Sequence, residues 1–220
     1  MKKLVTILVI LGMAGVASGA VVNPATIAAN ANKVFGDGFY DPDYEAINAA
    51  NGRGMSGGLH SATEYDGWLG QPMTGTPAHG GLVSATLGWI VFDLGEAYDI
   101  SELKVWNVSG TGASGYGLRN VVVQHSLTGS TSETGDWTTA FTGEMTKGPN
   151  ASDTEPYPYT QIIDMGDASM RYVGITVNSN WNGSTSYTGL NEVQFEIVPE
   201  PMTLAVLALA SGLVLLRRRR

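Results

Sequence analysis

The chain has 220 residues, no cysteine, and 20 acidic against 12 basic side chains, for a net charge of −8. Its length allows one domain with a sizeable core, and the lack of cysteine excludes disulfides and thiol chemistry. Six basic and 19 acidic residues lie within 21–198, so this part carries a net charge of −13. That charge would repel the phosphates of nucleic acids, which excludes them as expected partners.

The first 20 residues have the three parts of a secretory signal peptide. Lysines at positions 2 and 3 precede an apolar run over residues 4–16 and small residues at 17–20. This order directs a chain to export, with cleavage expected after Ala20. We therefore expect an exported protein in which residues 1–20 are removed and residues 21–198 form the working domain.

Between the two ends, the sequence predicts β-strands and loops. Only Ala25–Ala31 and Tyr44–Ala50 could hold a helical turn. In five later segments apolar residues recur at every second position, so each segment has one side to bury. These sides are Ile90, Phe92 and Leu94; Leu103 and Val105; Val121 and Val123; Val173, Ile175 and Val177; and Val193, Phe195 and Ile197. Two sheets packed face to face would bury them, which predicts an all-β sandwich.

The order of these segments resembles the discoidin domain. Residues 48–70 (NAANGRGMSGGLHSATEYDGWLG) are followed by GWIVFDLGEAYDISELKVWNV, LRNVVVQHSLTG, RYVGITVNSNW and GLNEVQFEI. The family is also called the coagulation factor five/eight type C domain and, in its sugar-binding branch, the family 32 carbohydrate-binding modules. The resemblance spans nearly all of residues 21–198. It implies an eight-stranded antiparallel jelly-roll β-sandwich of the galactose-binding-domain-like kind, with ligand loops at one end.

The resemblance also implies one structural calcium ion. Calcium-bearing members use an Asp-Gly loop, a hydroxyl residue five positions after the Asp, and a Glu that opens the final strand. The matching positions are Asn48, Asn51, Arg53, Ser56 and Glu192. Asn51 stands where the pattern has Asp, which keeps an oxygen ligand but removes one negative charge, unless a nearby acid such as Asp66 compensates. The alternative is that Asn51 and the next glycine form a tight turn and Glu192 is exposed.

Four side chains are candidates for contact with a glycan. They are Trp68, Tyr116, Arg119 and Trp181. Aromatic faces pack on pyranose rings, and arginine donors bind sugar hydroxyls. In the family's topology the loops that carry these residues would converge at one end. Each aromatic could instead cap the core, and Arg119 could form an ordinary salt bridge. The other tryptophans, at 89, 106 and 137, lie on or beside strands and are interpreted as packing residues.

No catalytic motif accompanies these residues. The histidines at 60, 79 and 125 fit no Ser-His-Asp order and no HExxH, and the chain has no glycine-rich phosphate loop. The sequence therefore predicts a protein that is not an enzyme.

The last 22 residues consist of Pro199-Glu200-Pro201, an apolar run over 202–216 and four arginines. As a helix, the run would cover roughly 22 Å, less than the ~30 Å hydrocarbon core of a bilayer. The arginines would hold this end in the cytoplasm. The tail resembles the sorting signal of PEP-CTERM proteins, which implies a temporary inner-membrane anchor removed by an exosortase-type protease. The alternative is a permanent tail anchor.

Together these features predict a binding module at the cell surface or in the extracellular matrix. The expected partner is an extracellular polysaccharide or glycan of a biofilm or cell envelope, with calcium stabilising the domain. The alternative is a structural or adhesive surface protein that contacts other proteins and binds no sugar.

Overall fold

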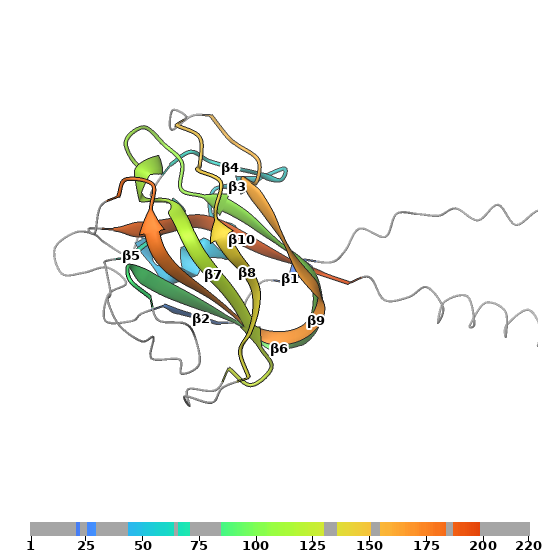
Figure 1. Ribbon diagram of the computed structural model, residues 1–220. Helices are drawn as coiled ribbons and strands as arrows, with labels where there is room; N and C mark the ends of the chain where they lie inside the picture. Colours follow the sequence, from blue (N-terminus) through green and yellow to red (C-terminus); the bar gives the residue numbers. More distant parts are fainter. Residues whose placement is uncertain are drawn as a thin grey trace, which may run out of the picture. The chain divides into compact units, whose positions relative to one another are not determined.

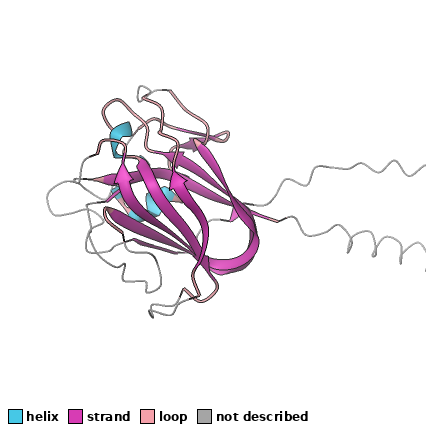
Figure 2. Ribbon diagram, in the orientation of Figure 1, coloured by secondary structure: helices cyan, strands magenta, loops and turns pink. Residues whose placement is uncertain are grey.

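Strands dominate the part of the chain that the computed structural model describes (Figures 1 and 2). The described residues are 21–22, 26–29, 44–63, 66–70, 85–129, 136–150, 155–183 and 187–198. The predicted signal peptide and the predicted sorting signal, with Pro199, Glu200 and Pro201, lie outside them. Within these ranges the helices are single turns, too short to cross a bilayer.

The elements follow one another along the chain in a simple order. They are β1 (Val21–Val22), β2 (Thr26–Ala29), η2 (Ala46–Ala49), β3 (Met55–Ser56), β4 (Leu59–His60), β5 (Trp68–Gly70), β6 (Gly88–Asn107), η4 (Ser114–Tyr116), β7 (Leu118–Ser126), β8 (Thr138–Glu144), β9 (Gln161–Asn180) and β10 (Thr188–Ile197). The described strands belong to one compact unit, Ala20–Val198.

Two long strands, β6 and β9, build both layers of the sandwich. The first half of β6 pairs with β2 and the second half of β9, whereas its second half pairs with β10 and the first half of β9. The main sheet runs in the order β1-β10-β6-β9-β7-β8, and these pairings are all antiparallel. Figure 1 shows β6 and β9 curving together, so that the sheet folds back on itself. The predicted all-β antiparallel sandwich is therefore confirmed.

An irregular stretch of pairing lies at the bend of β6. Pairing with β9 is interrupted between Asp93 and Tyr98, and Gly95 there adopts a φ of 88°, which glycine accepts without strain. Arg171 on β9 donates hydrogen bonds to both carboxylate oxygens of Asp93, at 2.8 and 2.9 Å. The two segments that the sequence predicts as separate strands, around Ile90 and around Leu103, are thus one bent strand.

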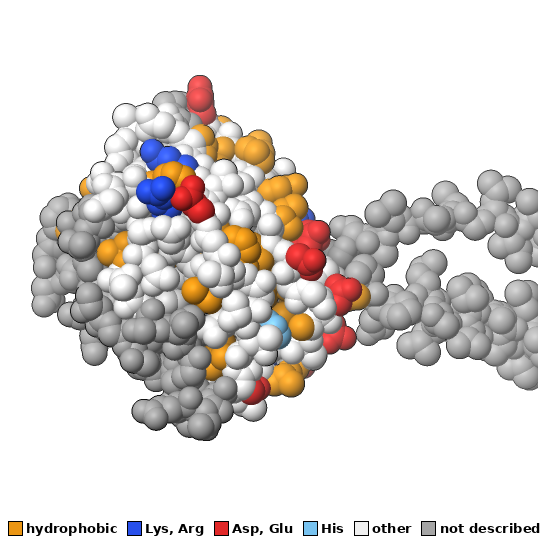
Figure 3. Space-filling model, viewed as in Figure 1, with side chains coloured by type: hydrophobic (Ala, Val, Ile, Leu, Met, Phe, Trp, Pro, Cys, Tyr) orange, Lys and Arg blue, Asp and Glu red, His pale blue; other side chains and the backbone are white. Residues whose placement is uncertain are grey.

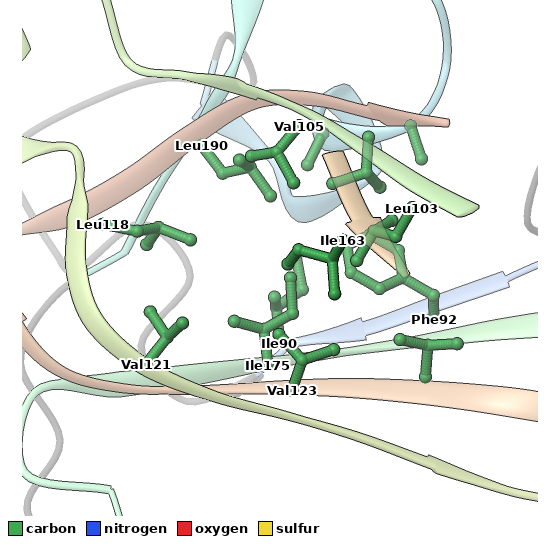
Figure 4. Close-up of a cluster of buried hydrophobic side chains, with 14 of the residues drawn as sticks. Ile90, Phe92, Leu103, Val105, Leu118, Val121, Val123, Ile163, Ile175 and Leu190 are labelled. Atoms are coloured by element: carbon green, nitrogen blue, oxygen red, sulfur yellow. The ribbon is translucent and has the colours of Figure 1, made fainter. Parts of the chain in front are cut away.

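The predicted inward faces form one hydrophobic core. Of the thirteen apolar residues expected on these faces, twelve are buried in a single cluster and Ile197 packs against it. Figure 4 shows side chains from β6, β7, β9 and β10 pointing toward one another between the strands. The rings of Phe92 and Phe195 meet at 5.5 Å with an angle of 64°. Burying each such side chain contributes about 1.5–3 kcal/mol relative to leaving it in water, so this core is the main stabilising element in a chain without disulfides.

The two segments expected to allow a helical turn have different outcomes. Ala46–Ala49 forms the 3-10 helix η2 within the predicted range 44–50. Thr26–Ala29 instead forms strand β2, which pairs with residues 90–93 of β6, so that expectation is wrong. A strand edge supplies backbone partners that the local sequence does not reveal, and this tertiary context outweighs local propensity.

Candidate functional site

The loop between η2 and β3 meets the middle of β10 at Glu192. The backbone N–H of Gly52 donates to both carboxylate oxygens of Glu192, at 3.2 and 3.3 Å. Gly52 adopts a φ of 74°, a left-handed conformation that favours glycine. The positive φ that the predicted turn requires is therefore present at Gly52, whose N–H faces the carboxylate that the resemblance implies as a calcium ligand. We call residues 48–56 the cation loop.

Glu192 is a buried carboxylate. Its exposed fraction is 1 %, which corrects the alternative that it is an exposed residue at the start of a strand. Burial raises its pKa to about 8, and the hydrogen bond from Gly52 opposes this rise only in part. None of the ion pairs between described residues includes it. Burial thus disfavours the ionised form of Glu192, and a cation bound at this carboxylate would stabilise that form.

Two asparagines of the cation loop are joined to each other by a hydrogen bond. Asn48 is 4 % exposed and its Oδ1 accepts a hydrogen bond from Asn51 Nδ2 at 2.9 Å. Asn51 Oδ1 in turn accepts from the backbone N–H of Arg53 at 2.8 Å. The loop thus concentrates oxygen atoms near one buried carboxylate, and oxygens are the ligands that calcium prefers.

The other predicted ligands, Arg53 and Ser56, are exposed. The Arg53 guanidinium donates to Asp66 at 3.1 Å, so Asp66 is already compensated by this arginine. Ser56 is exposed on β3, where it pairs with Leu59 of β4. No group of three or more His, Asp or Glu side chains converges in the described ranges. The residues therefore fit a hard cation held by one carboxylate and neutral oxygens, a donor set of low charge.

Three predicted ligand residues converge at one end of the sandwich. The guanidinium of Arg119, on β7, lies over the ring of Trp181 at 4.9 Å from its centroid. The backbone N–H of Trp181 donates to the carbonyl of Gly117 at 3.2 Å, which holds the turn after β9 against the segment after η4. Tyr116 ends η4, directly before Gly117. The predicted convergence is therefore present for Tyr116, Arg119 and Trp181.

Arg119 also forms the salt bridge that was the alternative interpretation. Its Nε donates to Glu144 Oε2 at 2.9 Å, and the two side chains are 42 % and 48 % exposed. An exposed pair of this kind contributes at most about 1 kcal/mol. Only this one of the five guanidinium donors has a described protein acceptor, so the remaining donors can reach a ligand.

Tyr187 joins this group although the sequence reasoning missed it. Its ring meets that of Tyr116 edge-on, at 5.6 Å and 85°, and its carbonyl accepts a hydrogen bond from Asn180 Nδ2 at 2.5 Å. Both rings are half-buried. The only signal in the sequence was an aromatic residue just before the final strand. We call Tyr116, Arg119, Trp181 and Tyr187 the ligand end.

Trp68 does not belong to the ligand end. It lies on β5, pairs with Leu190 of β10 and is 2 % exposed within the core. A Cβ at Gly70 would lie 2.7 Å from its ring, so the indole is enclosed on that side as well. Its interpretation as a ligand platform is therefore wrong. The expected packing roles of Trp89 and Trp106 are confirmed, at 3 % and 1 % exposure.

Charge is unevenly distributed over the face seen in Figure 3. Basic atoms gather at its upper left beside acidic and apolar atoms, while acidic atoms line its right side. Across the strands, Glu102 lies opposite Glu196 on β10 and opposite Asp164 on β9. Like charges in such positions are mutually unfavourable, and Glu196 is compensated by an ion pair with Lys104. The acidic surplus is therefore concentrated away from the basic group on this face.

Comparison with known proteins yields structural neighbours only. No protein-family model and no curated protein matches the sequence. The GH31 CBM32-2 module bound to GalNAc is 9 % identical, with 79 % of this chain and 97 % of that chain covered and a TM-score of 0.49. The family 32 module of NanJ from C. perfringens, in complex with galactose, is 12 % identical over 77 % and 91 % of the chains, with a TM-score of 0.45.

A third neighbour comes from a different enzyme. Chitosan-binding module 1 of a chitosanase/glucanase from Paenibacillus sp. IK-5 is 17 % identical over 79 % of this chain and 95 % of that chain, with a TM-score of 0.45. At such identities a likeness concerns the course of the chain and not its site residues. The function of the ligand end therefore rests on its own geometry.

Proposed function

We propose that this chain is an exported, non-catalytic binding module that attaches to an extracellular polysaccharide or glycan. The observation that carries the proposal is a pair of side-chain contacts at the ligand end, with Arg119 stacked on Trp181 and Tyr116 packed against Tyr187. Sugar rings have an apolar face and a hydroxylated edge, so they need an aromatic surface next to hydrogen-bond donors. Tyr116, Tyr187 and Arg119 supply both kinds of group.

Trp181 has a supporting role in this proposal. One face of its ring is covered by the Arg119 guanidinium, so the indole holds the arginine in place, and the two tyrosines offer the aromatic surface. Stacking one sugar ring contributes on the order of 1 kcal/mol beyond the area it buries, so the affinity of a single module is weak. Many copies on one surface would raise the retention through avidity.

Calcium is the second part of the proposal. Glu192, with Asn51 and Ser56 through side-chain oxygens and Asn48 and Arg53 through backbone carbonyls, would hold the ion. When bound, it would compensate the buried carboxylate and join the cation loop to β10. Because only the folded chain brings these groups together, bound calcium stabilises the fold by RT ln(1 + [L]/Kd).

The location of the protein rests on the two ends of its sequence. Export follows from residues 1–20, and residues 199–220 would form a transient inner-membrane anchor that an exosortase-type protease removes, leaving the module at the cell surface or in the matrix. Mass spectrometry of protein from the native host tests this. We expect a mature chain without the arginines 217–220, and their presence on protein recovered outside the cell would contradict it.

A glycan array probed with residues 21–198, with and without chelator, tests the binding function. We expect retention on one class of polysaccharide. If no glycan binds while the domain is folded, the alternative of a structural or adhesive protein that contacts other proteins replaces this proposal. Arg119→Ala is the matched variant, because it removes a partly exposed side chain of the ligand end and leaves the core intact. We expect it to bind the glycan more weakly than the wild type while remaining folded.

A further inference from the structure

Tyr157 is a buried hydrogen-bond link beside the cation loop. Its hydroxyl accepts from Asn191 Nδ2 at 2.9 Å and donates to the carbonyl of Asn107 at 2.7 Å. The exposed fractions are 4 % for Tyr157 and 0 % for both asparagines. Asn191 directly precedes Glu192 on β10. The hydroxyl of Tyr157 therefore joins the strand that carries the buried carboxylate to the end of β6.

The backbone of Tyr157 holds the other side of the cation loop. Its N–H and carbonyl exchange two hydrogen bonds of 2.8 Å with His60 of β4. His60 pairs in turn with Met55 on β3, at the end of the cation loop. A single residue thus contacts both the hairpin that follows this loop and the strand that faces it.

Asn107 continues this link toward the ligand end. Its Nδ2 donates to the carbonyls of Leu118 and Thr146, at 2.7 and 2.9 Å. Its Oδ1 accepts from the backbone N–H groups of Leu118 and Val108, at 2.8 and 3.0 Å. Leu118 directly precedes Arg119 at the start of β7. The side chain of Asn107 therefore fixes the backbone on which the key arginine of the ligand end stands.

We propose that Tyr157 and Asn107 are positioning residues that couple the cation loop to the ligand end. The side-chain amide of Asn107 uses both of its donor hydrogens and accepts two hydrogen bonds. Because a buried polar group that loses its partner lowers stability, the hydrogen-bonded residues are expected to move together. A cation bound at Glu192 fixes the neighbouring Asn191 and, through its hydrogen bond, Tyr157. Tyr157 then fixes Asn107, which orders the backbone of Leu118. The coupling is reciprocal, so a ligand at Arg119 strengthens cation binding by the same factor. This inference rests on the proposed function.

Residue-resolved amide hydrogen exchange on residues 21–198, in calcium chloride or in chelator, tests the coupling without any sugar. In the wild type, calcium should slow exchange at Gly52 and also at Leu118 and Trp181, whose N–H groups are bonded within the linked segments. Tyr157→Phe keeps the ring but removes both hydroxyl bonds. It should weaken calcium binding about tenfold, as expected when a buried hydrogen-bonding group is lost. It should also abolish the effect at Leu118 and Trp181 even at saturating calcium.

Two matched variants separate positioning from general stability. Tyr98→Phe removes an exposed hydroxyl, bonded to Glu96 at 2.8 Å, and Ile163→Val removes a buried methyl group without touching the network. Both should keep the calcium effect at Leu118. If Tyr157→Phe does not fold, Asn191→Ser tests the same step, because it removes the donor to the Tyr157 hydroxyl and leaves the bond from Tyr157 to Asn107.

The outcomes distinguish the inference from the proposal on which it rests. Calcium protection at Gly52 that does not reach Leu118 and Trp181, or that reaches them equally in Tyr157→Phe, overturns the coupling alone. No calcium effect in the wild type overturns the cation site and the coupling together. Failure to bind any polysaccharide, with calcium protection intact at both ends, overturns the glycan proposal and supports the positioning role.

Discussion

The two candidate sites each contain one decisive ionisable side chain, and they differ in its surroundings. Glu192 is 1 % exposed, and its hydrogen-bond partner among the described residues is the Gly52 N–H, whereas Arg119 is 42 % exposed, paired with Glu144 and stacked on Trp181. Water and a carboxylate compensate the arginine, but Glu192 has neither. The contribution of an ionisable residue to the free energy of unfolding therefore depends on its burial. Changes at Glu192 should therefore affect stability, and changes at Arg119 should affect binding.

The largest expected effect is that of calcium on melting. At a free calcium concentration 100 times Kd, chelation should lower stability by about 2.7 kcal/mol, or roughly 5–10 °C for a domain of this size. Glu192→Gln should abolish the chelator effect, because it removes the only buried carboxylate of the site. Calorimetry measures both, with Glu144→Gln as the exposed control. Identical wild-type curves with and without calcium would contradict the cation site.

A second effect should be seen in metal-free protein as the pH changes. The pKa of Glu192 is about 8 in the fold, against an ordinary value of 4.5. Between pH 4.5 and pH 8, the folded state therefore keeps a proton on Glu192 that the unfolded state has released. Stability is then fully present below pH 4.5 and falls as the pH rises through about 8. We expect a loss on the order of 2 kcal/mol, smaller than the bare shift implies because water can penetrate the site.

Urea denaturation in chelator at pH 5, 6.5 and 8 measures this dependence. Glu192→Gln should remove the fall, and the difference between the two proteins isolates the share of Glu192. His60 and His125, whose pKa values burial lowers, contribute equally to both proteins and cancel in the difference. A wild type that gains stability over this range relative to the variant would sink the assignment of a neutral buried carboxyl group.

The third effect concerns binding rather than stability. Arg119→Ala and Tyr187→Ala should each weaken retention on a polysaccharide affinity gel by about 1 kcal/mol, a factor near five. Both side chains are partly exposed, so the folded state should persist. Full retention of both variants would remove the ligand end from the proposal and favour the adhesive alternative.

The smallest effect should come from the exposed ion pair. Glu144→Gln removes the partner of Arg119 but leaves the guanidinium in water and on Trp181. The free energy of unfolding should change by less than about 1 kcal/mol, as chemical denaturation can measure. A larger loss would mean that the pair holds the ligand end together, and the contrast with Glu192 would then disappear.

Sequence reasoning succeeded where a short periodic pattern decides the outcome. The inward faces, from Ile90 to Phe195, were predicted because alternation forces one side of a strand into the core. It failed for Trp68, since a tryptophan in a glycine-rich segment can cap a core or meet a ligand, and only the pairing of β5 with β10 encloses this one. Tyr187 was missed because its partner, Tyr116, lies 71 positions away.

By itself, the sequence determined the class of the fold, the composition of the core and the absence of cysteine chemistry, because these follow from residue types and their local spacing. Only the tertiary structure decided the burial of Glu192, the bend of β6 and the hydrogen-bonded link from Asn191 through Tyr157 to Asn107. Burial and hydrogen bonding between distant segments depend on which strands pair, and no local pattern encodes that pairing. The protonation state of Glu192 is therefore a property of the fold, although the presence of a glutamate at position 192 is a property of the sequence.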